Sequence, residues 1–391
     1  LLKNGYQKSN IFLNLGFIEI FEKNYKEAIN YLTKAKSLKK ENNLELLFGL
    51  VNSYLALREI KQARLLLDEA IINNPKSELL LFNYAKIEED LFNFYKAINL
   101  YEKGLKLSPK NYKALSNLGR LYQKTNSYLN AIEVYKKAIK LQPQISHLKV
   151  SLLTCKAFAC DWSELKSTKE ILNKIDNSGQ EICPFELLPL EDNPKNHLQR
   201  AKLFFDKKYR RISQDIAYVP KKKIRIGYFS ADFRKHAVMY LIKGLFNLHD
   251  KDQFDVYIYS LASKEDELTD ELKNNINVFK NLSDISDENA ALIAREDSLD
   301  IAVDLMGYTK NTRLSIFSLR VAPIQISYLG YPGSTGSDCM DYLIADKIII
   351  PDKFRKFYSE KVIHMPNCYQ CNDSGRRTAK KEFTKTELGL P

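Results

Sequence analysis

The sequence contains no apolar run long enough to cross a membrane. A membrane-spanning helix needs about 18 or more consecutive apolar residues, and no segment of these 391 residues approaches that length. The first residues also lack the pattern of a signal peptide. We therefore expect a soluble protein without a membrane partner. The chain begins at Leu1 instead of methionine, which indicates that an upstream segment is missing.

Cysteines are few and dispersed. The six of them stand at 155, 160, 183, 339, 368 and 371, which is not the disulfide framework of a small secreted domain. A cytoplasmic protein is expected. Cys368 and Cys371 have CxxC spacing, but no second cysteine or histidine pair lies nearby to complete a zinc site. The sequence therefore predicts no metal.

Several catalytic motifs are also missing. The chain has no GxSxG elbow, no HExxH pair and no GxxxxGK[ST] phosphate loop. The glycine-rich stretch from Gly330 to Gly336 is neither that loop nor a GxGxxG fingerprint. By itself it indicates only a sharp backbone turn that can approach a ligand closely.

The net charge of +12 raises the question of nucleic-acid binding. Residues 1–143 hold 23 Lys and Arg against 14 Asp and Glu, whereas residues 144–391 hold 37 against 34. The excess is spread as single lysines on expected helix faces, without a basic stripe or interleaved aromatics. A solvated surface is the better interpretation, and no nucleic-acid partner is predicted.

A 34-residue repeat fills the first third of the chain. Ala63, Ala97 and Ala131 are spaced by 34 residues, and so are Pro75, Pro109 and Pro143. Small residues at fixed positions let paired helices approach closely, and proline ends the second helix of each pair. Residues 1–143 are therefore predicted to form four helix-turn-helix units that match the tetratricopeptide repeat.

Asparagines recur on the first helix of three repeats, at Asn14, Asn83 and Asn117. Amides on a concave face can hydrogen-bond the backbone of an extended peptide, which would hold many sequences alike. An asparagine that only suits a solvated groove explains the pattern equally well, and both interpretations stay open.

The period is lost from 144 to 220, which we interpret as a packed helical connector. From 221 to 391, short apolar runs alternate with helical segments; the runs are 224–229, 254–261, 301–308, 324–331 and 341–346. This βαβ alternation predicts a mostly parallel sheet covered by helices. Ligands of such sheets bind beyond the carboxyl ends of the strands, and His236 follows the first of those ends. From chemistry alone, a single histidine in such a loop is more often structural than catalytic.

The residues also carry a family resemblance. After the repeats come Cys-Asp-Trp at 160–162, then RIGYFSADFRKHAV, DLMGYT, RVAPIQISYLGYPGSTG, MDYLIAD and YSEKVIHMP in that order. This series resembles the O-linked N-acetylglucosamine transferase and SPINDLY family. The resemblance implies an α plus α/β fold, in which a tetratricopeptide-repeat superhelix precedes the N-terminal Rossmann-like half of a GT-B-type glycosyltransferase.

The activity implied by this resemblance is inverting, metal-independent sugar transfer to Ser or Thr hydroxyls of proteins. It requires no cofactor beyond a nucleotide sugar, most simply UDP-N-acetylglucosamine, although family members also use fucose nucleotides. The family histidine maps onto His236. Its D-L-x-G-[YH]-T segment places Asp304, Tyr308 and Thr309 at the same cleft, and for Asp304 a strand-end cap is an equal alternative. The donor-proximal loop maps onto Gly330, Pro332, Gly333, Ser334 and Thr335.

The chain stops where family members continue into their second Rossmann-like half. We therefore expect these residues to fold but not to turn over alone. Acceptor proteins or peptides are expected to bind along the repeats. The alternative function is a peptide-binding scaffold whose catalytic half is incomplete or inactive.

Overall fold

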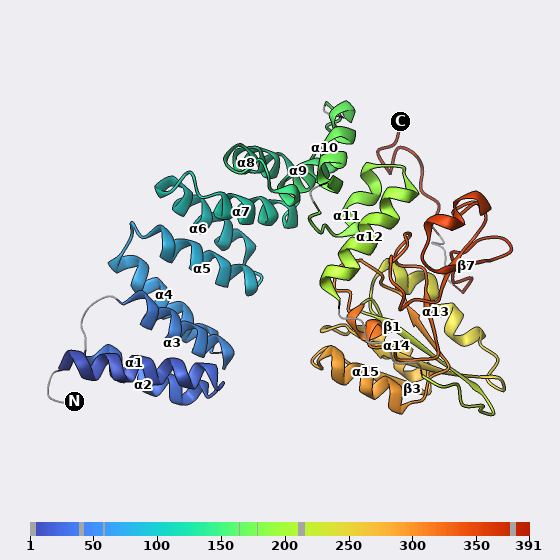
Figure 1. Ribbon diagram of the computed structural model, residues 1–391, viewed down its shortest axis with the longest axis horizontal. Helices are drawn as coiled ribbons and strands as arrows, with labels where there is room; N and C mark the ends of the chain where they lie inside the picture. The colour runs from blue at the N-terminus through green and yellow to red at the C-terminus, as the bar shows by residue number, and fades with distance from the viewer. Residues whose placement is uncertain are drawn as a thin grey trace. The chain divides into compact units, whose positions relative to one another are not determined.

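The computed structural model describes residues 5–38, 43–57, 59–163, 165–177, 179–209, 216–375 and 381–391. The chain divides into two compact units, Leu1–Leu165 and Lys166–Pro391, called here the repeat unit and the sheet unit (Figure 1). Among the described residues, no helix combines the length and the apolar character needed to cross a membrane.

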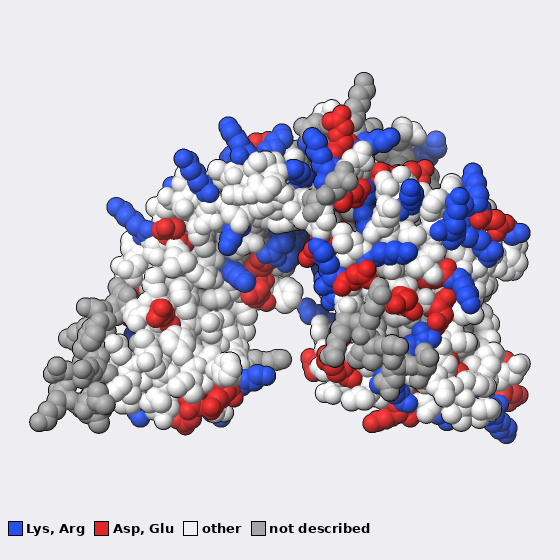
Figure 2. All heavy atoms as spheres, viewed as in Figure 1, with Lys and Arg blue, Asp and Glu red and all other residues white. Residues whose placement is uncertain are grey.

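The repeat unit is built of consecutive helices, each packed against the next (Figure 1). They are α1 (Gly5–Phe21), α2 (Tyr25–Leu38), α3 (Leu44–Ala56), α4 (Ile60–Asn73), α5 (Glu78–Asp90), α6 (Phe94–Leu107), α7 (Tyr112–Lys124), α8 (Tyr128–Leu141) and α9 (Ser146–Phe158). The predicted helix-turn-helix repeats are confirmed. On the face shown in Figure 2, basic side chains of this unit protrude mostly singly, as expected for a solvated surface.

Small residues and caps explain why these segments pair. A Cβ atom on Gly119 would lie 2.7 Å from the ring of Tyr135, so α7 and α8 approach more closely than a larger residue allows. Asn111 accepts a hydrogen bond from the backbone N–H of Ala114 and thereby caps the start of α7. Ser77 caps α5 in the same way, two residues after a repeat proline.

The sheet unit begins with α10 (Leu165–Asn177), α11 (Pro184–Leu187), the 3₁₀ helix η1 (Leu188–Leu190) and α12 (Pro194–Lys208). Its strands are β1 (Ile224–Ser230), β2 (Phe254–Ser260), β3 (Val278–Asn281), β4 (Ile301–Asp304), β5 (Ile324–Ser327), β6 (Tyr342–Ala345) and β7 (Lys361–His364). Between them lie α13 (Ala237–Leu248), α14 (Glu267–Asn275), α15 (Asp287–Glu296), α16 (Ser315–Ser318) and the 3₁₀ helix η2 (Asp352–Phe357).

The strands form one sheet in the order β3-β2-β1-β4-β5-β6-β7. Every neighbouring pair is parallel. Strand order therefore reverses between β1 and β4, which is the topological switch point where open α/β sheets bind ligands. The predicted parallel sheet is confirmed.

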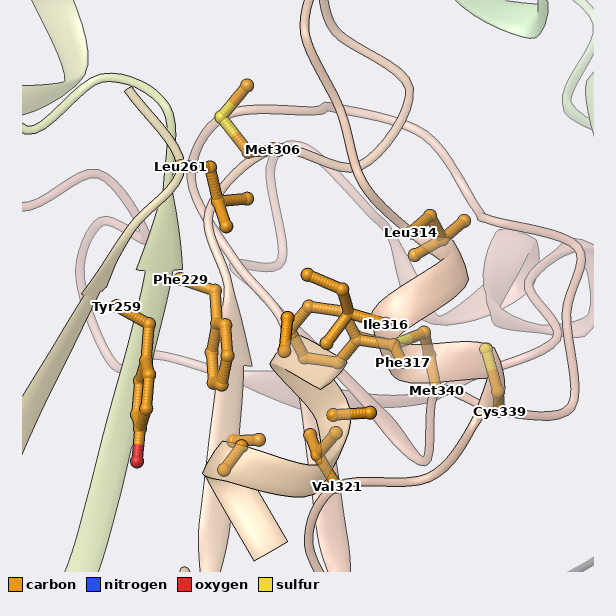
Figure 3. Close-up of a cluster of buried hydrophobic side chains, with 14 of the residues drawn as sticks. Phe229, Tyr259, Leu261, Met306, Leu314, Ile316, Phe317, Val321, Cys339 and Met340 are labelled. Carbon is orange, nitrogen blue, oxygen red and sulfur yellow. The ribbon is translucent and has the colours of Figure 1, made fainter. Parts of the chain in front are cut away.

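A cluster of buried hydrophobic side chains, with several aromatic rings, forms part of the core of the sheet unit (Figure 3). The rings of Phe229 and Tyr259 stack with centroids 4.3 Å apart, and Phe317 meets Phe229 edge-on at 5.1 Å. The same cluster includes Phe204 and Phe205 of α12. Helix α12, within the segment interpreted as a connector, is thus part of the core of the sheet unit. The domain boundaries at 143 and 220 stay predictions.

Candidate active site

Three loops meet at the carboxyl edge of the sheet, around the switch point. Met306, in the loop after β4, contacts the end of β1: its sulfur accepts hydrogen bonds from Ser230 Oγ at 3.3 Å and from the Ala231 N–H at 3.4 Å. The loop after β5 closes on the same place. A Cβ on Gly330 would lie 1.9 Å from the carbonyl oxygen of Leu305, so only glycine fits there.

His236 lies at the start of α13, after the loop that follows β1. It is the N-cap residue, and its Nδ1 accepts a hydrogen bond from the backbone N–H of Val238 at 3.3 Å. Its side chain is 39% exposed, so the ring is not enclosed in the apolar core. Among the described residues, Nε2 has no hydrogen-bond partner. Because Nδ1 accepts the Val238 N–H, the proton of the neutral ring is on Nε2 in this tautomer.

Asp232 stands four residues before His236, and its Oδ2 is 3.4 Å from His236 Nδ1. When Nδ1 carries no proton, it accepts the hydrogen bond from the Val238 N–H. When Nδ1 is protonated, its N–H can point toward the Asp232 carboxylate instead. Burial raises the pKa of the Asp232 carboxyl, and the nearby His236 and Arg234 act in the opposite direction. This pair has the geometry of a base and its orienting carboxylate.

Asp304 ends β4, and its carboxylate is buried. The two oxygens accept backbone hydrogen bonds from the N–H groups of Met306 and Gly307, both at 2.9 Å. Burial raises the pKa of Asp304 to about 6, although these two bonds act in the opposite direction. Because both oxygens hold the turn, the geometry is that of the strand-end cap.

Tyr308 and Thr309 follow this turn. The Tyr308 hydroxyl donates a hydrogen bond to the carbonyl oxygen of Thr335 at 2.5 Å, and its ring meets Tyr331 edge-on at 5.4 Å. Burial raises the pKa of Tyr308 far above its ordinary value. Thr309 Oγ1 donates to the carbonyl oxygen of Met306 at 2.8 Å. Tyr308 therefore joins the loop after β4 to the glycine-rich loop.

The glycine-rich loop is fixed at its second end by α12. Gly336 has a φ of +68°, and a Cβ there would lie 2.4 Å from the backbone nitrogen of Lys202. Both features require glycine. Between the two ends, Ser334 and Thr335 hydrogen-bond with the buried carboxylate of Glu360.

A cavity of about 490 Å³ opens beside this loop. Pro332, Gly333 and Ser334 form one wall. The other walls come from the segment 188–198 and from the residues around η2, including Phe354 and Tyr358. The cavity is thus lined mainly by apolar side chains on one side of a glycine-rich backbone.

The predicted site residues fall into three groups. His236 lies at the end of β1 and does not line this cavity, whereas Pro332, Gly333 and Ser334 do. Asp304, Tyr308, Thr309 and Gly330 lie in the contacting loops between them.

The repeat asparagines have different surroundings. Asn14 is exposed on α1. Asn83 Nδ2 donates to the carbonyl oxygen of Leu79, one turn earlier in α5. Asn117 is the most engaged, because Nδ2 donates to the Tyr101 hydroxyl at 3.1 Å and Oδ1 accepts from Arg120 at 3.3 Å. Asn14 and Asn83 keep more hydrogen-bonding capacity for a peptide than Asn117 does.

Two of the residues described above had no role assigned from the sequence. Asp232 stood in the S-x-D-F-x-x-H motif, and its i,i+4 spacing to His236 was the available signal. Glu360 stood in the YSEK motif, but no sequence signal connects it with a loop 25 residues earlier.

Comparison with protein families now adds to this geometry. Residues 195–382 match the model of glycosyl transferase family 41, and residues 22–81, 80–111 and 112–145 match tetratricopeptide-repeat models. Over residues 195–382 the chain is similar to glycosyl transferase family 41. The resemblance to O-linked N-acetylglucosamine transferases and SPINDLY proteins is confirmed.

The curated relatives that this chain matches include two proteins named as UDP-N-acetylglucosamine–peptide N-acetylglucosaminyltransferases. The chain is 34% identical over 176 residues to the probable UDP-N-acetylglucosamine–peptide N-acetylglucosaminyltransferase SEC of Arabidopsis thaliana, covering 44% of this chain and 18% of the relative. It is 30% identical over 237 residues to the UDP-N-acetylglucosamine–peptide N-acetylglucosaminyltransferase of Caenorhabditis elegans, covering 55% of this chain and 20% of the relative. The chain spans about a fifth of the length of these relatives.

A solved structure shares the fold. A mutant of the Thermobaculum terrenum O-GlcNAc transferase superposes with a TM-score of 0.59 at 23% identity, covering 75% of this chain and 58% of that one. At this identity the match concerns the fold alone. It confirms helical repeats followed by a parallel sheet.

Proposed function

We propose that this protein is an inverting, metal-independent glycosyltransferase that moves N-acetylglucosamine from UDP-N-acetylglucosamine to serine or threonine hydroxyls of proteins. The observation that carries this function is the His236 ring, partly exposed at the carboxyl edge of the sheet next to the switch point. The match of residues 195–382 to the family-41 model and the names of the curated relatives support it.

In this mechanism His236 is the general base. A serine hydroxyl is a weak nucleophile. In the tautomer whose Nδ1–H faces Asp232, Nε2 takes the hydroxyl proton while the oxygen bonds to the anomeric carbon and the bond to the leaving diphosphate breaks. Attack from the opposite side inverts the anomeric centre. A positioned base of this kind contributes roughly 10² to 10⁴ in rate. Asp232 holds the ring and stabilises the imidazolium that forms.

The loops beside His236 act as supports. Asp304 holds the Met306–Gly307 turn through both carboxylate oxygens. Tyr308 connects that turn to Thr335, so the glycine-rich loop and the base belong to one contacting set of loops. The accessible backbone of Pro332 and Gly333 is where we place the donor sugar.

The repeats are proposed to bind the acceptor polypeptide. Repeat arrays present extended binding surfaces, and the amides of Asn14 and Asn83 supply hydrogen bonds that do not depend on the bound sequence. A cytoplasmic location is part of the same proposal, and it is supported by six cysteines that are all free thiols.

Mass spectrometry tests this function. The longest protein that the gene encodes is co-expressed with candidate acceptor proteins, and the acceptors are examined for added N-acetylhexosamine on Ser or Thr. UDP-N-acetylglucosamine and GDP-fucose are then compared as donors with the purified protein. No addition from either donor would contradict the function and favour a peptide-binding scaffold.

A further inference from the structure

Glu360 is a buried carboxylate at the edge of the sheet. It directly precedes β7, the last strand in the sheet order, and only 4% of its surface is exposed. Ionised carboxylates rarely stay buried unless charge or hydrogen bonds compensate the lost hydration. What surrounds Glu360 therefore indicates what it does.

Four donors converge on this carboxylate. Oε1 accepts from the Thr335 N–H at 2.7 Å and from the Thr335 hydroxyl, and Oε2 accepts from Ser334 Oγ at 2.7 Å and Ser359 Oγ at 3.1 Å. Three of the four donors belong to the glycine-rich loop. Ser334 Oγ in turn accepts from the Gly336 N–H at 3.1 Å, which extends the network along the loop.

A cation does not share this network. Within the described residues, no Lys, Arg or His forms an ion pair with Glu360. Its charge is balanced only by hydrogen bonds, which are stronger when one partner is ionised. An ionised carboxylate suits this place because it only accepts, and all four neighbours donate to it.

We propose that Glu360 is a positioning residue for the sugar-nucleotide site. Its carboxylate holds Ser334 and Thr335, so that Pro332 and Gly333 keep a fixed conformation at the wall of the cavity. The inference rests on the proposed function, since the ligand of this loop is taken to be the donor. Glu360 itself does not touch the donor and acts through the loop.

The remaining contacts explain why this one carboxylate controls the loop. Gly330 is fixed against the Leu305 carbonyl and Gly336 against α12. Thr335 is held from both sides, by Glu360 at its N–H and hydroxyl and by the Tyr308 hydroxyl at its carbonyl. Without Glu360, the middle of the loop loses the hydrogen bonds that fix it between its two ends.

The test is Glu360→Gln in the longest protein that the gene encodes. A glutamine keeps the size but offers one acceptor oxygen, and its NH₂ group faces hydroxyls that donate in the native network. Ordering a freed loop then costs binding energy before any chemistry occurs. We expect KM for UDP-N-acetylglucosamine to rise about tenfold and kcat to change less than about threefold.

Hydrogen exchange gives a second readout that needs no activity. The amides of Thr335 and Gly336 should exchange at least about tenfold faster in Glu360→Gln, because both bonds depend on the carboxylate network. Glu271→Gln is the matched control, since Glu271 is half exposed and pairs with Lys243 on the surface. It should change neither readout.

Each outcome separates the alternatives. Unchanged hydrogen exchange at the amides of Thr335 and Gly336 would overturn the inference. A fall in kcat at constant KM would overturn it as well, because that is the result expected for a residue with a merely structural role. If the wild type transfers no sugar, the proposed function fails while the exchange data still decide whether Glu360 holds the loop. Should Glu360→Gln not fold, Ser334→Ala removes one loop donor and should shift exchange in the same direction.

Discussion

Asp232 Oδ2 lies 3.4 Å from His236 Nδ1, and both residues belong to the loop that joins β1 to α13. The opposite nitrogen of the ring has no partner among the described residues. In the tautomer whose Nδ1–H faces Asp232, one side of the imidazole serves for orientation and the other can accept a proton from substrate.

Asp232→Asn should separate these two roles. The amide keeps the shape but loses the charge that stabilises the imidazolium, so we expect kcat to fall by about 10- to 100-fold with little change in KM. Steady-state kinetics measures both constants. Asp270→Asn, an exposed carboxylate of α14, is the control. A rise in KM without a loss of kcat would show that Asp232 acts on binding instead.

Asp304 predicts a pH dependence of stability. Its folded pKa of about 6 is above its unfolded value, so folding favours the protonated form and the stabilisation is lost as pH rises toward 6. This difference between the folded and unfolded pKa corresponds to about 3 kcal/mol. Asp304→Asn carries no such charge.

The free energy of unfolding of Asp304→Asn minus that of wild type should therefore increase as pH rises from about 4 to about 6, because only wild type loses this stabilisation. Calorimetry of both proteins across this range measures the difference. A difference that stays constant with pH would contradict the burial argument for this carboxylate.

Gly119→Ala tests the close packing of α7 on α8. The new Cβ would meet the ring of Tyr135 at 2.7 Å, and that ring is only 1% exposed and cannot move aside. Overpacking costs about 1–3 kcal/mol and outweighs the gain in helix propensity of about 1 kcal/mol. Thermal melting followed by circular dichroism should show a lower Tm. Lys113→Ala, exposed in the same helix, should be near neutral, and a more stable Gly119→Ala protein would be inconsistent with the packing.

Asn83→Ala tests the peptide-binding role of the repeats. Its amide oxygen has no hydrogen-bond partner among the described residues, so removal should weaken acceptor binding without disturbing the fold. We expect KM for protein acceptors to rise about three- to tenfold, while short peptides confined to the sheet unit are unaffected. Asn30→Ala, an exposed asparagine of α2, is the matched control. Equal effects on long and short acceptors would point away from the repeats.

The sequence was sufficient to predict the helices that follow the 34-residue repeat and the strands that carry a continuous apolar run. Alanines 34 residues apart predicted the helix pairs because close packing requires small residues at those positions. Apolar runs predicted β1, β2, β4, β5 and β6. The edge strands β3 (Val278–Asn281) and β7 (Lys361–His364) escaped prediction, because they are short and largely half-exposed or exposed, so they have no apolar run.

The site was only partly accessible from the sequence. His236 was placed at the carboxyl edge because it follows a recognisable strand. For Asp304, only the coordinates show that both carboxylate oxygens accept hydrogen bonds from the turn after β4. Glu360 was out of reach because its contacts to Ser334 and Thr335 depend on how β7 joins the sheet.

The most direct test of the account compares wild type with His236→Ala in sugar transfer to a protein acceptor, measured by mass spectrometry. Circular dichroism and melting establish that the variant is folded, which the half-exposed position of the ring leads us to expect. The account predicts that transfer falls by about 10² to 10⁴. A folded His236→Ala protein that transfers sugar at the wild-type rate would contradict it.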